Sequence, residues 1–141
     1  MKSGKKPSPG ATDWLLLGLA LVFFVGILTF FKPCGPKEDG SWMTCHWAGQ
    51  AVTGVAAAML ILAVCRLLGT ARFKTGLDAA LIVLSALATA LPGHLIGLCM
   101  MHDMRCRRIM TPCVLVLSIL TILAAAADML LQNKKEPRHE V

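Results

Sequence analysis

Four long apolar blocks, separated by short polar connections, dominate the chain. They cover about residues 14–31, 47–68, 77–101 and 113–131. A helix needs roughly 20 mostly apolar residues to cross about 30 Å of hydrocarbon, because each residue adds about 1.5 Å. Each block approaches or exceeds this length, and no connection is long enough for a soluble domain. The pattern therefore predicts an all-α membrane protein, a bundle of four transmembrane helices.

The first block begins after three lysines, as a secretory signal peptide does. Its apolar run is 18 residues long, whereas a signal-peptide core usually has about 7–15. No small-x-small cleavage site follows it before Pro33. We therefore interpret this block as a retained span.

An even number of spans places both chain ends on one side of the membrane. Nine of the 14 Lys and Arg residues belong to that side and five to the other. Since basic residues in short loops favour the cytoplasm, we expect cytoplasmic termini and location in the inner membrane. The expected organisation is a basic N-terminus (1–13), a four-helix domain (14–131) with extracytoplasmic loops at 32–46 and 102–112, and a basic tail (132–141).

Composition agrees with this assignment. The chain is 56% apolar and 16% charged, whereas a soluble domain is about a quarter charged. The net charge of +6 does not indicate nucleic-acid binding, because the basic residues lie at the ends of apolar blocks. The expected partners are the lipid bilayer and either another membrane protein or further copies of this chain. No hydrolase nucleophile elbow, phosphate loop or catalytic carboxylate pair is visible, so enzymatic activity is not expected.

A few polar residues lie within or beside the blocks. Asp78 and Asp128 occur near the cytoplasmic ends of their helices, and Asp13 precedes the first block, where a negative charge suits the helix dipole. The carboxylates within the blocks can reach water or pair with nearby basic residues: Arg66, Arg72 and Lys74. We expect structural roles for all three aspartates.

Small residues four apart occur in two blocks, as Gly54 with Ala58 and Gly93 with Gly97. Such pairs line one helix face and allow backbones to approach closely in lipid. They favour a compact bundle.

Pro92 predicts a kink or break in the third block, because proline removes a helix hydrogen bond. His94 follows it directly. A histidine within the membrane is a candidate site residue. The alternative is a neutral imidazole that donates to a backbone carbonyl freed by the proline.

Sulfur is concentrated on the outer face. Five of the six cysteines fall there, and Cys65 alone lies at the cytoplasmic end of the second block, where we expect an inert thiol. The five are Cys34, Cys45, Cys99, Cys106 and Cys113. An oxidising compartment favours disulfides between them. Four could form two bridges and leave the fifth free or paired with another chain, with the connectivity open.

Two other chemistries compete with structural disulfides at this face. Thiolate, thioether and imidazole ligands suit copper(I) or zinc, although no C-x-x-C or H-x-x-x-H spacing is present. The candidate metal ligands are Cys45, His46, Cys99, Met100, His102 and Cys106. Thiol–disulfide exchange is the third possibility, because arginines beside a Cys99–Cys106 couple could stabilise thiolates. With structural disulfides preferred, no cofactor is expected.

The same outer-face residues carry a family resemblance. The stretch Met43-Thr-Cys-His-Trp-Ala-Gly-Gln-Ala51, preceded by Pro33-Cys34, resembles a signature of the DUF4418 family of small bacterial four-span membrane proteins. Cys99-Met100 and Met104-Arg-Cys106 resemble that family as well. The resemblance implies a partner role, because members often accompany ABC-type export permeases. Sequence analysis thus favours a non-enzymatic accessory subunit, with a metal-binding or redox protein as the alternative.

Overall fold

The computed structural model describes residues 9–30, 35–42, 44–97 and 106–135, without the side chains of Cys45, Ala71, Cys106 and Lys135. Within these ranges the chain forms four long helices: α1 (Ala11–Thr29), α2 (Thr44–Leu68), α3 (Ala71–Ala90) and α4 (Thr111–Lys135). A π-helical turn at Cys106–Met110 leads into α4. All four helices are long and apolar enough to span a membrane, as predicted.

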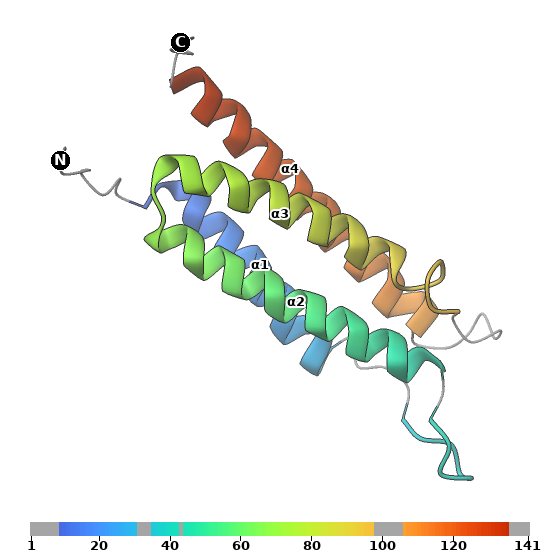
Figure 1. Ribbon diagram of the computed structural model, residues 1–141. Coiled ribbons are helices and arrows are strands. Elements are labelled where there is room, and N and C mark those ends of the chain that lie inside the picture. The colour runs from blue at the N-terminus through green and yellow to red at the C-terminus, as the bar shows by residue number, and fades with distance from the viewer. Residues whose placement is uncertain (1–8, 31–34, 43, 98–105, 136–141) are drawn as a thin grey trace.

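The helices form an up-and-down bundle in which each one packs beside its neighbours in the sequence (Figure 1). α1 packs against α2 and α4, and α3 packs against the same two helices, so the four close into a ring. The start of α1 and the end of α4 therefore lie at the same end of the bundle (Figure 1). The four-helix membrane fold expected from the sequence is confirmed.

A two-residue turn joins α2 to α3. Gly69 and Thr70 fill it, and the Lys74 amide donates to the Thr70 carbonyl at 3.0 Å to begin α3. A Cβ atom at position 69 would lie 2.7 Å from the Phe73 ring carbon Cδ1, so a larger residue in this turn would force the Phe73 ring to shift. This turn brings the last residues of α2 and the first residues of α3 together.

The third helix differs from the predicted block. It occupies Ala71–Ala90, so the expectation that it begins near residue 77 and continues to 101 is wrong. The predicted break at Pro92 is confirmed: Gly93 adopts a left-handed conformation with φ of 96°. The amides of Leu95 and Ile96 then donate to the carbonyls of Ala90 and Leu91, each at 3.0 Å. Since Gly93 and Gly97 lie beyond the helix, they do not form a helix face.

The buried side of each helix follows the helical period. On α2 the buried apolar residues recur every three or four positions: Ala48, Val52, Ala56, Met59 and Ala63. Gly54 faces outward instead, and a Cβ atom there would have no neighbour within 4 Å. The pair of small residues at 54 and 58 therefore does not mediate packing within this bundle.

Two apolar clusters fill the interior. One contains Phe23, Ile27, Val52, Ala56, Ala88, Leu91, Met110 and Val114. The other contains Leu16, Met59, Leu81 and Ala125. Only 28–33% of each spanning segment is buried inside the bundle, so most residues of every helix lie at least partly on its outward side.

Overpacking tests the inward face of α2. We expect Ala56→Leu to lower the free energy of unfolding by about 1–3 kcal/mol, because extra methylenes have no room beside Phe23 and Ala88. Thermal unfolding in detergent measures the loss. Gly54→Leu is the matched control and should leave the melting temperature unchanged or higher, since its side chain points outward. Equal losses in both variants would contradict the assigned faces.

A buried ion network as candidate functional site

Five charged side chains converge at the end of the bundle that holds the start of α1 and the end of α4. Asp13 comes from α1, Arg66 from α2, Lys74 and Asp78 from α3, and Asp128 from α4. Each is buried, with at most 7% of its surface exposed. We refer to these five residues as the ion network. Every helix contributes to it, which makes it the most concentrated polar feature of the described chain.

Arg66 is the centre of the ion network. Its Nε atom lies 3.0 Å from Asp78 Oδ1, and its Nη2 atom lies 3.5 Å from Asp13 Oδ1 and also pairs with Asp128 Oδ2. The planar guanidinium can reach three carboxylates because its nitrogen atoms point in different directions. One side chain thereby connects α2 to the three other helices.

Asp13 combines a local and a long-range role. Its Oδ2 atom accepts a hydrogen bond from the Gly10 amide at 2.9 Å, which caps the first turn of α1. The same oxygen lies 2.5 Å from Lys74 Nζ on α3. The helix-end role predicted for Asp13 is therefore confirmed, and its partnership with two cations is an addition that sequence analysis missed.

Besides Arg66, Asp128 has polar neighbours on α1 and on its own helix. Thr12 Oγ1 donates to its Oδ1 atom at 2.8 Å, and Gln132, one turn further along α4, donates to its Oδ2 atom. Gln132 Nε2 also lies 3.4 Å from Asp78 Oδ2. Thr75 Oγ1 donates to Gln132 Oε1 at 3.1 Å. Gln132 thus ties α4 to α3 and lies between two carboxyl groups.

The network has more carboxylates than cations. Three aspartates meet one arginine and one lysine. Within the described part of the chain, Arg66 Nη1 has no hydrogen-bond partner, and the Arg66 Nε–Asp78 Oδ1 pair is close without hydrogen-bond geometry. Removing one member of a buried ion pair is strongly destabilising, because the remaining charge is left uncompensated in a poorly solvating interior. The network is therefore a strong constraint on how the helices meet.

The expectation that Asp78 and Asp128 pair with a nearby basic residue is confirmed, and that residue is Arg66. Lys74 pairs with Asp13 instead. Arg72 is exposed and stands outside the network. The helical period of the buried α2 residues continues to position 66, and this periodicity is the signal that could have placed Arg66 inside the bundle.

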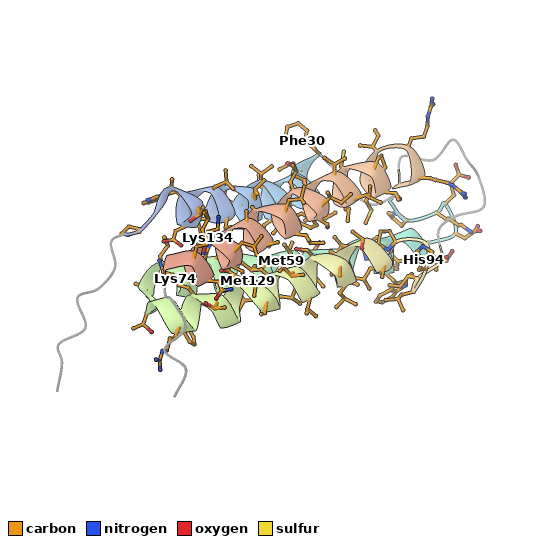
Figure 2. All side chains as sticks on the ribbon, turned by 90° about the horizontal axis from the view of Figure 1, so that it is seen from above. Phe30, Met59, Lys74, His94, Met129 and Lys134 are labelled. Atoms are coloured by element: carbon orange, nitrogen blue, oxygen red, sulfur yellow. The ribbon has the colours of Figure 1, made fainter. Side chains whose placement is uncertain are left out.

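The outer-face candidates lie at the opposite end. His46 stacks on Trp42 with ring centroids 4.1 Å apart and meets the edge of Trp47 at 5.9 Å. His94 is exposed in the turn after α3, at the end of the bundle far from Lys74 (Figure 2). It therefore lies beyond the spanning helix rather than at a kink inside it.

Cys113 and Cys65 are half-buried free thiols at opposite ends of the bundle. The remaining cysteine and metal-ligand candidates lie outside the described residues or have undescribed side chains: Cys34, Cys45, Cys99, Met100, His102 and Cys106. The structure thus places His46 alone from the predicted metal set. In the described ranges no three His, Cys, Asp or Glu side chains are grouped as metal ligands.

Four helices that are long and apolar enough to span a membrane identify the chain as a multi-pass membrane protein. Residues 15–131 match the family described as "Domain of unknown function (DUF4418)". The match covers all four helices apart from the first turn of α1 and the last turn of α4, and the chain belongs to this family. Comparison with curated proteins and with solved structures returned no match.

Removing the central cation tests the ion network. We expect Arg66→Leu to cost about 3–5 kcal/mol of unfolding free energy, because it leaves three buried carboxylates with Lys74 alone. Arg72→Leu is the matched control: this arginine is exposed near the same end of the bundle, and its loss should change stability by less than about 1 kcal/mol. Thermal or denaturant unfolding in detergent distinguishes the two. Similar stability of both variants would contradict the central role of Arg66.

Proposed function

We propose that the protein is a non-enzymatic accessory subunit of the bacterial inner membrane and that it acts by contact with another membrane protein. The observation that supports this most strongly is the distribution of polarity. The charged side chains inside the bundle pair with one another, while the outward helix faces are apolar. Such a molecule is suited to associate through its surface.

The outward faces of the helices provide that surface. Large apolar side chains more than 60% exposed occur on three of the helices, among them Ile61, Val83, Leu123 and Leu130. In a membrane these side chains contact either acyl chains or another helix, and helix association there depends on close packing and on buried polar contacts. The partner that the family resemblance implies is an ABC-type export permease, and we take it as the proposed partner.

The proposed orientation puts the ion network at the cytoplasmic end of the bundle. The first turn of α3 carries Arg72, and the end of α4 carries Lys134, both exposed at that end. Together with the basic tails, they give the termini's side the larger share of positive charge. The cysteine-rich loops then face the oxidising compartment.

We further propose that two disulfides brace the outer loops. The free thiol at Cys113 supports its assignment as the fifth, unbridged outer cysteine. The four bridging residues are then Cys34, Cys45, Cys99 and Cys106. A loop of 10–15 residues closed by a disulfide is stabilised by roughly 3 kcal/mol in the chain-entropy model, which suits short loops without a core of their own.

Thiol counting tests the disulfide cap. Unreduced, denatured protein should react with thiol reagent at two positions, Cys65 and Cys113, and at all six cysteines after reduction. In intact cells, an impermeant reagent applied after reduction should label the outer cysteines and leave Cys65 unlabelled. Six reactive thiols without reductant, together with stoichiometric copper or zinc, would instead establish the metal-binding alternative. Labelling of Cys65 alone would reverse the orientation.

Purification from the native membrane tests the partner role. In a mild detergent and at the physiological level of expression, the protein should elute together with a permease subunit in a complex larger than the bundle itself. A double substitution on the outward face, Val83→Trp with Leu123→Trp, should weaken this association while the melting temperature stays the same, because both side chains point away from the core. Elution as a monomer, or as an oligomer of this chain alone, would refute the accessory role.

A further inference from the structure

Charge balance in the ion network requires one additional positive charge. Three carboxylates and two cations, none more than 7% exposed, would leave one net negative charge in the interior. An unbalanced buried charge is costly, and a buried carboxylate ordinarily avoids that cost by binding a proton. A bound cation is the other way of restoring balance.

Two of the three carboxylates are well supplied with donors. Asp13 receives Lys74 Nζ at 2.5 Å and the Gly10 amide at 2.9 Å, with Arg66 nearby. Asp128 receives the Thr12 hydroxyl at 2.8 Å, the Gln132 amide and the Arg66 guanidinium. Several donors stabilise a carboxylate, and both of these groups have such donors.

Asp78 has the poorest set of donors. It is fully buried, and its Oδ1 atom has no hydrogen-bond partner within the described residues, although Arg66 Nε is 3.0 Å away. Its Oδ2 atom has only the weak contact with Gln132 at 3.4 Å. The same amide nitrogen reaches Asp128, so two carboxyl groups are neighbours and the ionisation of one disfavours that of the other.

We propose that the ion network is a proton-binding site and that Asp78 carries the exchangeable proton. With Asp78 neutral, Asp13 and Asp128 balance Arg66 and Lys74, and the interior has no net charge. The groups that face Asp78 are Arg66 from α2, Gln132 and Asp128 from α4 and, through Arg66, Asp13 from α1; Lys74, one turn earlier on the same helix, pairs with Asp13. Release of the proton leaves a net negative charge where the four helices meet, which weakens their association at this end.

The sign of the pH dependence follows from the bound proton. The folded chain holds a proton on Asp78 that the unfolded chain releases near neutral pH, so stability falls as pH rises. Asp78→Asn replaces the neutral carboxyl with an amide of nearly the same shape. Near neutral pH, this variant should have the same melting temperature as the wild type. At higher pH, its melting temperature should fall less than that of the wild type, because the variant has no proton to release at position 78.

Infrared spectroscopy of the full chain in liposomes tests the proposal directly. The wild type should show the carbonyl stretch of a protonated carboxyl at neutral pH, and the band should disappear in alkaline buffer. Asp78→Asn should lack this band. Asp39→Asn, which changes an exposed loop carboxylate, should retain it. Should the amide variant fail to fold, Asp78→Glu keeps a titratable carboxyl and should shift the band.

Three results would overturn the proposal. The first is the absence of any protonated carboxyl in the wild type at neutral pH. The second is persistence of the band in folded Asp78→Asn, or an unshifted band in Asp78→Glu. The third is a melting temperature that rises with sodium relative to choline at equal ionic strength, which would identify a bound cation as the balancing charge. These results are independent of whether an accessory partner is found.

Discussion

The contact of the Arg66 guanidinium with carboxyl groups from the three other helices is the constraint on which the rest of this bundle depends. A buried arginine in an apolar environment is tolerated only when its charge is compensated at short range. Asp13 and Asp128 supply that compensation and Asp78 lies against the same guanidinium, so the three carboxyl groups must lie at the same depth. The up-and-down order of the helices satisfies this requirement, because it brings one end of each helix to the same side of the bundle.

Apolar packing and the ion network have different consequences. The two interior clusters consist mainly of aliphatic side chains, which could repack after a small rotation of a helix. The ion network permits much less rotation, since each carboxylate must stay within reach of a particular nitrogen atom. The packing thus provides much of the compactness of the bundle, and the charges specify one arrangement of the helices.

Sequence alone predicted the number of helices and their class, because block length and hydropathy determine which segments can span a membrane. It also placed Asp78 and Asp128 near basic partners. It missed the start of α3, where an amphipathic first turn with Lys74 precedes the apolar block, and it extended the span to residue 101 although it predicted the break at Pro92. It did not assign Asp13 to the interior, since the pairing with Lys74 depends on how α1 and α3 are rotated in three dimensions.

The tight α2–α3 turn has a consequence for how the bundle is put together in the bilayer. This hairpin carries both cations of the network, Arg66 and Lys74, whereas α1 and α4 supply Asp13 and Asp128. The hairpin therefore has a surplus of positive charge, and the helices that flank it in the sequence carry the matching negative charge. Neither the hairpin nor the pair of flanking helices is electrically neutral by itself. Association of the newly inserted helices within the bilayer is therefore favoured, because it brings the opposite charges together.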